Sequence, residues 1–136
     1  MMAKLSDIVS FCDERTRRSE IADFPGSYNG LQFSNSGNVR RIGAAVDAGL
    51  IPFEKAAEKG IDFLIVHHGM FWEPLAPIAG AAYEKVKTLL NADCAVYGSH
   101  LPLDLHPEIG NNVLLAKEIG LEPCDTFLPF EGNDVG

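Results

Sequence analysis

The residues of this sequence best suited to chemistry are two adjacent histidines, His67 and His68. They follow the apolar run Phe63 to Val66 and precede Gly69. Successive side chains of a strand point to opposite faces, but a glycine allows the chain to turn sharply and to aim both imidazoles outward. Neutral imidazole is a common metal ligand, so each histidine of the pair could serve one of two ions.

A second group follows a later apolar run and could reach the same place. His100 comes directly after Val96 to Ser99, and Asp104 lies four residues further on, in a loop that contains Pro102. The carboxyl ends of parallel strands meet at one edge of a sheet, where α/β proteins bind their ligands. Imidazole together with carboxylate suits zinc, iron or manganese better than calcium.

Each of these residues also has a purely structural interpretation. His67 and His68 could be partly buried, hydrogen-bonded residues of a strand end, and Asp104 could cap the loop that follows. Three of the four histidines in the chain nevertheless fall at two predicted strand ends, with a carboxylate nearby. This combination favours a metal site made of His67, His68, Asp104 and His100.

Other residues admit a functional role, but a structural one is favoured for them. Asp47 ends an earlier apolar run and could be a metal ligand or an outer partner, that is, a residue that hydrogen-bonds a ligand. A carboxylate before a helix is, however, more often an N-cap. Phe71 and Trp72 could stack on a heterocyclic substrate, yet aromatic residues near a strand end more often fill the rim of the core. His106 has no predicted strand to place it and is expected to be exposed to solvent. The sequence contains no G-x-S-x-G, Walker or G-x-G-x-x-G motif, which leaves metal chemistry as the favoured kind.

The composition indicates an acidic cytoplasmic protein that binds neither nucleic acid nor membrane. Nineteen acidic against eleven basic side chains give a formal net charge of −8, which repels phosphate backbones. No apolar stretch approaches the length needed to cross a bilayer, and no signal peptide is evident. The cysteines Cys12, Cys94 and Cys124 form no C-x-x-C pair, so we predict reduced, buried thiols rather than disulfides or a thiolate zinc site.

The spacing of apolar residues predicts one α/β domain over residues 1–136. A helix is predicted over 5–12, and the stretch 21–37, rich in Gly, Ser, Asn and Pro, is expected to be a loop. The rest of the chain is predicted to alternate between strands at 41–46, 61–66 and 94–97 and crossover helices at 52–59, 83–90 and 112–119. Strands separated by helices form parallel βαβ units, so we expect a three-layer, mostly parallel or mixed sheet with helices on both faces.

Several blocks of the sequence resemble, in order, the type 2 GTP cyclohydrolase I homologues, also called Ngg-interacting factor 3-like dinuclear-metal proteins. The twin-histidine block from Phe63 to Gly69 is the most specific of them. The other blocks are Asn29-Gly30-Leu31-Gln32, Val46-Asp47-Ala48, Ser99-His100-Leu101-Pro102-Leu103-Asp104 and Gly110-Asn111-Asn112-Val113-Leu114-Leu115-Ala116. Together the blocks extend the resemblance over nearly the whole chain.

The resemblance implies that His67, His68 and Asp104 bind two divalent metal ions, with His100 beside them as a ligand or an outer partner. It also implies a ring-shaped homo-hexamer and a nucleotide as the small-molecule substrate. Members of the family are longer, and a second ligand set of the form H-x-x-x-E comes from a C-terminal segment that this chain does not contain. We therefore expect the chain to be the N-terminal part of a longer metal-binding protein and to bind metal more weakly than the complete protein.

Functions of different classes remain open on this sequence. The first is a metal-dependent hydrolase that resembles the GTP cyclohydrolase homologues, in which paired cations would activate a water for attack. The alternative is a non-catalytic metal-binding interaction protein, in which the cations order the strand-end loops and the surface recruits partners. A third interpretation is a vestigial fold without metal. Turnover by metal-loaded protein separates the first two.

Overall fold

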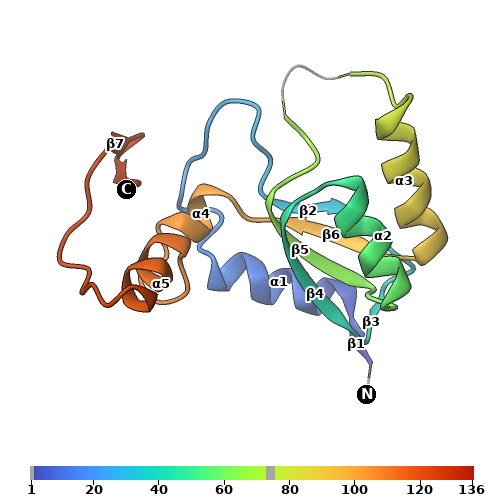
Figure 1. The fold of residues 1–136 in the computed structure, drawn as a ribbon, viewed down its shortest axis with the longest axis horizontal. Helices are drawn as coiled ribbons and strands as arrows, with labels where there is room; N and C mark the ends of the chain where they lie inside the picture. Colours follow the sequence, from blue (N-terminus) through green and yellow to red (C-terminus); the bar gives the residue numbers. More distant parts are fainter. Residues whose placement is uncertain (1, 73–75) are drawn as a thin grey trace.

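The computed structural model describes residues 2–72 and 76–136 as a mixed α/β fold (Figure 1). Its main sheet contains the strands β2 (Gly30–Phe33), β4 (Ile42–Asp47), β5 (Phe63–His68) and β6 (Ala95–Gly98). They lie side by side in the order β2, β6, β5, β4. The strands β4, β5 and β6 run parallel, whereas β2 pairs antiparallel with β6. The predicted α/β class is confirmed.

Helices cover both faces of the main sheet and so make three layers. They are α1 (Leu5–Arg15) on one face, and α2 (Leu50–Glu58) and α3 (Ala81–Ala92) on the other. Phe63 of β5 shares a buried core with Leu5 of α1. The next residue, Leu64, shares the opposite core with Phe53 of α2 and Leu89 of α3. This two-residue alternation is the period of a strand, and burial of apolar side chains on both faces stabilises the sheet.

The predicted helices and strands around the sheet are present, with small shifts at their ends. The helix predicted over 52–59 begins at Leu50, because proline is tolerated in the first turn of a helix and Pro52 is its third residue. The two adjacent histidines are the last residues of β5 rather than residues that follow the strand. Both imidazoles therefore start from the carboxyl edge of the sheet, next to the end of β6.

The prediction of a loop over 21–37 was wrong for residues 30–33, which form β2. Leu31 and Phe33 of this strand pair with Tyr97 and Val96 of β6. Pairing and packing against the sheet outweigh the local turn composition around the Asn29-Gly30 step. Nearby, two short strands, β1 (Ala3–Lys4) and β3 (Asn38–Val39), pair antiparallel with each other.

The C-terminal elements form an arm beside the sheet rather than a cover over it (Figure 1). They are α4 (Leu101–Asp104), α5 (Asn111–Glu118), β7 (Pro129–Phe130) and β8 (Asn133–Asp134). The prediction that 112–119 is a crossover helix was wrong, because α5 leads into the antiparallel pair of β7 and β8 and has no buried residue. Helical spacing predicts that a helix forms, but not which strand follows it. A small core of Ile21, Leu101 and Val135 attaches the arm.

The cysteines agree only in part with their prediction. All three are free thiols, and Cys12 and Cys94 are buried. Cys124 is exposed, so its predicted burial was wrong. It lies between α5 and β7, outside the buried apolar cores of the described residues. Among the described residues, no helix has the length and apolar character required to cross a bilayer.

Candidate metal centre

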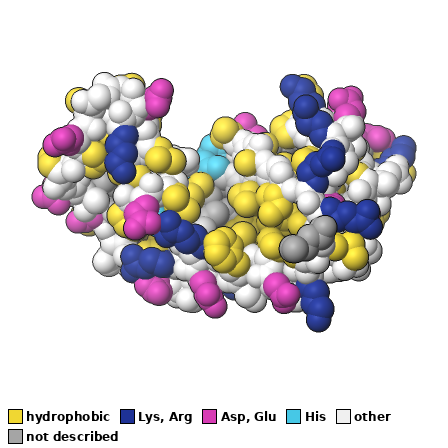
Figure 2. Space-filling model, turned by 90° about the horizontal axis from the view of Figure 1, so that it is seen from below, with side chains coloured by type: hydrophobic (Ala, Val, Ile, Leu, Met, Phe, Trp, Pro, Cys, Tyr) yellow, Lys and Arg dark blue, Asp and Glu magenta, His cyan; other side chains and the backbone are white. Residues whose placement is uncertain are grey.

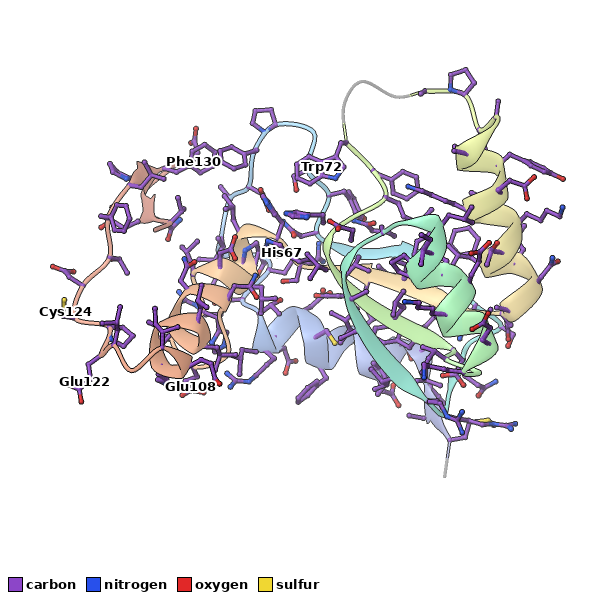
Figure 3. The ribbon with its side chains drawn as sticks, viewed as in Figure 1. His67, Trp72, Glu108, Glu122, Cys124 and Phe130 are labelled. Carbon is purple, nitrogen blue, oxygen red and sulfur yellow. The ribbon has the colours of Figure 1, made fainter. Side chains whose placement is uncertain are left out.

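The adjacent ends of β5 and β6 bring three histidines together. His67 and His68 end β5, and His100 follows Ser99 just beyond β6. One ring nitrogen of each of these histidines lies within 4.8 Å of those of the other two. The centroid of the His67 ring is 4.6 Å from that of His68 and 4.8 Å from that of His100. Figure 3 shows His67 where the end of the sheet meets the arm.

Asp104 reaches the same cluster from α4. Its Oδ2 lies 3.5 Å from Nε2 of His67, and both side chains are largely buried. Asn111, the first residue of α5, donates a hydrogen bond from Nδ2 to Oδ1 of Asp104 at 2.8 Å. The structure thus places His67, His68, His100 and Asp104 together, while their role as metal ligands stays a prediction.

In His67 and His68 it is Nδ1 of each ring that makes the hydrogen bond, while Nε2 of His67 faces the carboxylate of Asp104. Nδ1 of His67 lies 3.0 Å from the carbonyl oxygen of Ser99, and Nδ1 of His68 lies 2.7 Å from Oδ1 of Asp47. Both oxygens are acceptors, so Nδ1 is the donating nitrogen of each ring in these hydrogen bonds. A histidine that binds a metal usually donates its other ring N–H in this way.

His100 has a partner with a largely buried side chain, Asp23, which sequence reasoning missed. Oδ1 of Asp23 lies 2.8 Å from Nδ1 of His100, and the Asp23 side chain is only 5% exposed. Burial opposes ionisation, but hydrogen bonds from Asn29, His100 and the backbone amides of Phe24 and Leu101 outweigh it and lower the pKa of Asp23. Asp23 is therefore a carboxylate that accepts the Nδ1 proton of His100. It lies in an irregular stretch of the chain, and no spacing in the sequence pointed to it.

Asp47 is the outer partner of His68 and not the N-cap of α2. That helix has Gly49 at its N-cap position, and no side chain caps it. In the parallel pairing of β4 with β5, Asp47 stands opposite His68, which places the carboxylate beside the imidazole. The favoured N-cap interpretation was therefore wrong. The hydrogen bond between Asp47 and His68 fits the alternative interpretation of Asp47 as an outer partner.

Gln32 of β2 links the chain just beyond β5 to the segment before β2, and it too was missed as a site residue. Its Oε1 accepts a hydrogen bond from the backbone N–H of Met70 at 2.6 Å, and its Nε2 donates to the carbonyl of Tyr28 at 2.5 Å. A Cβ atom at Gly69 or Gly98 would overlap Nε2 of Gln32. Gly69 was expected to make a sharp turn, but its φ is not positive. The absence of a side chain at Gly69 instead makes room for Gln32. The Asn29-Gly30-Leu31-Gln32 block was the feature of the sequence that could have pointed to Gln32.

The prediction that His106 is exposed was wrong. Its ring is buried, with Nε2 2.8 Å from Nη1 of Arg15 at the end of α1. The backbone N–H groups of Glu108 and Ile109 donate to its Nδ1 at 3.1 and 3.2 Å. The partner Arg15 lies 91 residues earlier in the chain, so no local pattern could reveal this contact. His106 does not belong to the cluster of His67, His68 and His100.

Phe71 and Trp72 do not fill the rim of the core, so that interpretation was wrong. Both side chains are exposed, by 39% and 38%. The indole of Trp72 meets the ring of His100 edge-on, with centroids 5.2 Å apart, and its Nε1 donates to the carbonyl of Gly69 at 3.2 Å. Trp72 therefore lies partly exposed beside the histidines, held by its hydrogen bond to Gly69 (Figure 3).

The chain matches one protein family along nearly its whole length. The family model described as Duf34/NIF3 (NGG1p interacting factor 3) matches residues 3–132. The chain belongs to the Duf34/NIF3 family. The resemblance found in the residue blocks is thereby confirmed.

Relatives within the Duf34/NIF3 family carry the name GTP cyclohydrolase 1 type 2 homolog. The one from Pyrococcus abyssi is 42% identical over 130 residues, which cover 96% of this chain and 51% of that protein. The one from Deinococcus radiodurans is 46% identical over 111 residues, which cover 81% of this chain and 42% of that protein. The chain spans about half the length of the curated relatives it matches.

Solved structures have the same fold as this Duf34/NIF3 chain. TTHA1606 from Thermus thermophilus matches with a TM-score of 0.86 at 42% identity, over 92% of this chain and 51% of that one. The protein ybgI, described as of unknown function, also matches with a TM-score of 0.86, at 37% identity, over 93% and 51% of the two chains.

Proposed function

We propose that the chain supplies part of a divalent-metal centre, in a metal-dependent hydrolase that resembles the GTP cyclohydrolase homologues. The observation that carries the proposal is the convergence of His67, His68 and His100, one ring nitrogen of each within 4.8 Å of the others, with Nδ1 of each ring engaged by an oxygen. His67, His68 and Asp104 are the proposed ligands, and His100 is a further ligand or an outer partner. Imidazoles with one carboxylate suit zinc, iron or manganese.

The proposed hydrolase gains Lewis acidity and a water of lowered pKa from the bound cation. The chain's own residues orient the site: Asp47 and the carbonyl of Ser99 hold the imidazoles, and Asn111 holds Asp104. The family resemblance implies two ions per complete site. Two cations about 3.5 to 4 Å apart repel each other and need several anionic ligands. Among the described residues, Asp104 is the proposed anionic ligand, so we expect this chain to bind one ion weakly.

A small-molecule substrate of the nucleotide class is part of the proposal. Its support is the name of the relatives, GTP cyclohydrolase 1 type 2 homolog, together with the partly exposed indole of Trp72 beside His100. A purine ring stacks favourably on an indole.

A ring-shaped homo-hexamer in the cytoplasm completes the proposal. Figure 2 shows hydrophobic side chains gathered beside a hollow in which histidine is visible. Large apolar residues such as Phe11, Val46 and Leu115 are each more than 60% exposed. Contiguous exposed apolar surface marks interaction sites. The free thiols of the chain fit a reducing compartment.

A non-catalytic metal-binding interaction protein is the second candidate. The family description as an interacting factor and the exposed apolar residues favour it. In this case the cations would order the strand-end loops for a partner without turnover. Metal binding by a protein that leaves nucleotides intact would favour this function over the hydrolase.

Calorimetric titration of the 136-residue chain with zinc and with manganese tests the metal centre. We expect one weakly bound ion per chain, and elemental analysis of the purified protein identifies the metal it retains. Absence of binding for both ions would contradict the metal centre. Two tight sites per chain would show that the ligand set is larger than proposed. Assays of nucleotide turnover by the metal-loaded protein then separate the hydrolase from the interaction protein.

A further inference from the structure

Asp23, Asn29 and His100 form a closed ring of hydrogen bonds behind the histidine cluster. Nδ1 of His100 lies 2.8 Å from Oδ1 of Asp23, and Nδ2 of Asn29 donates to Oδ2 of Asp23 at 2.7 Å. The backbone N–H of His100 donates to Oδ1 of Asn29 at 2.7 Å, which closes the ring. The segment that precedes β2 therefore holds both the imidazole and the main chain of His100.

The carboxylate of Asp23 accepts four hydrogen bonds. Besides His100 and Asn29, it accepts hydrogen bonds from the backbone N–H groups of Phe24 at 2.7 Å and Leu101 at 3.0 Å. A buried charge is costly unless it is fully hydrogen-bonded, and an apolar side chain of similar volume is often as stable in such a place. Packing alone therefore does not account for a charged group at this position. Of its four donors, the ring of His100 is the one that belongs to the histidine cluster.

We propose that Asp23 and Asn29 are positioning residues, which fix His100 as the tautomer whose Nε2 is unprotonated and hold that nitrogen toward His67 and His68. The consequence for metal binding rests on the proposed function, whereas the tautomer itself does not. Outer partners of this kind orient a metal-binding histidine and raise its basicity. Their loss typically lowers metal affinity by roughly 10- to 100-fold.

The partner of His100 is the one in the cluster that a substitution can test most sharply. The partner of His67 is the backbone carbonyl of Ser99, which a side-chain substitution does not remove. The partner of His68, Asp47, is 68% exposed, so water competes for its hydrogen bond. Asp23 is 5% exposed, and water has little access to replace it.

Asp23→Asn replaces one of the two accepting oxygens of Asp23 by a donating nitrogen, with little change in shape. The ring N–H of His100, the amide of Asn29 and the two backbone N–H groups all point at this side chain as donors. An amide has one accepting oxygen and one donating nitrogen. If the nitrogen faces His100, Nδ1 must accept, and the proton moves to Nε2. If it faces the other way, it meets the donors Asn29 and Leu101.

The experiment compares wild type, Asp23→Asn and the control Asp7→Asn, in which an exposed aspartate of α1 loses its charge. Long-range ¹H–¹⁵N spectra of the metal-free chain report which nitrogen of each histidine carries the proton, and His100→Gln assigns the signals of His100. Zinc titration of the same samples gives the affinity. We expect Asp23→Asn to populate the Nε2–H tautomer of His100 and to weaken zinc binding by about 10- to 100-fold. The Asp7→Asn control should retain both wild-type values.

A second variant covers the case in which Asp23→Asn does not fold. Asn29→Ala removes the acceptor of the His100 backbone N–H but leaves the pair of His100 and Asp23 in place. It should keep the wild-type tautomer and weaken zinc binding by a smaller factor. The inference is overturned if Asp23→Asn keeps both the wild-type tautomer of His100 and the wild-type affinity for zinc. If Asp23→Asn does not fold, an unchanged zinc affinity in Asn29→Ala overturns it.

The two proposals fail in different ways. A wild-type chain that binds no zinc, together with an altered His100 tautomer in Asp23→Asn, would overturn the metal centre and support the positioning role. A wild-type chain that binds zinc, together with an unaltered tautomer and affinity in Asp23→Asn, would support the metal centre and overturn the positioning role.

Discussion

The protonation of single nitrogen atoms decides what the histidine cluster can bind. Nδ1 of His67, His68 and His100 each faces an oxygen acceptor, and a neutral ring that donates from Nδ1 has its lone pair on Nε2. Nε2 of His67 in turn faces Asp104 at 3.5 Å. A divalent cation can accept these lone pairs without first displacing a proton, because the outer hydrogen bonds have already selected the tautomer.

Replacing either strand-end histidine should weaken zinc binding at the proposed centre. We expect His67→Ala and His68→Ala to lower zinc affinity by more than the roughly 10- to 100-fold that loss of an outer partner costs, because each removes a proposed ligand. The matched control is His106→Gln, since His106 is the histidine of the chain outside the cluster. Calorimetric titration measures all three. Equal loss of affinity in the His106 variant would point to a general effect on folding instead.

Burial of a thiol should make the fold sensitive to alkaline pH. Desolvation, aided by the charges of Asp62 and Asp93, raises the pKa of Cys94 from 9.0 to about 11. Between these two values the unfolded chain has lost a proton that the folded chain retains, so the free energy of unfolding falls as pH rises. The expected loss from pH 9 to pH 11 is on the order of 2 kcal/mol.

Urea unfolding at a series of pH values measures this loss. Cys94→Ala removes the thiol and should flatten the decline above pH 9. Burial also raises the pKa of Tyr97, so part of the decline at the highest pH should remain in that variant. An unaltered pH profile in Cys94→Ala would show that the thiol does not contribute.

At the scale of elements, the cluster depends on how three strand ends are aligned. The parallel register puts Asp47 of β4 opposite His68 of β5 and Val66 of β5 opposite Gly98 of β6. The antiparallel strand β2 then supplies Gln32, whose side chain fits against Gly69 and Gly98. The histidine-bearing ends are thus fixed from both sides of the sheet.

This fit predicts a coupled effect of two substitutions. Gly69→Ala should lower the free energy of unfolding by about 1 to 3 kcal/mol, because the three atoms nearest its new Cβ all belong to the Gln32 side chain. Gln32→Ala removes those atoms, so the double variant should be more stable than the sum of the single effects predicts. Urea denaturation of the four proteins in this cycle gives the coupling energy. Strictly additive effects would mean that Gln32 and Gly69 do not interact.

At the scale of the whole molecule, the distribution of apolar surface favours self-association. Hydrophobic side chains gather on the face shown in Figure 2, beside the hollow between the sheet and the arm. Val46 of β4, at the edge of the main sheet, is 63% exposed, and Leu115 of α5 is equally exposed. Covering such residues in a symmetric oligomer would remove apolar area from water.

Light scattering tests this association. The wild-type chain should form a homo-oligomer, and Val46→Glu should shift it toward the monomer, because a charge at a buried contact is costly. Ala82→Glu, which adds the same charge to an exposed position on α3, is the control and should leave the assembly unchanged. A monodisperse wild-type monomer at high concentration would contradict the prediction.

The sequence by itself determined the α/β class, the central parallel strands and the grouping of His67, His68, His100 and Asp104. Apolar periodicity is a local property, and it predicts β4, β5, β6 and the helices around them without knowledge of the fold. The rule that parallel strands end at one edge then brings their terminal residues together. These conclusions need only short stretches of chain and one general rule about sheets.

Only the tertiary structure decided which residues surround the histidines. Asp23 and His100 are 77 residues apart, and Arg15 and His106 are 91 apart. Antiparallel pairing with β6 made a strand of residues 30–33 despite their turn-like composition. In each case the deciding energy comes from hydrogen bonds and burial between segments distant in the chain, and such contacts leave no periodic signal in the sequence.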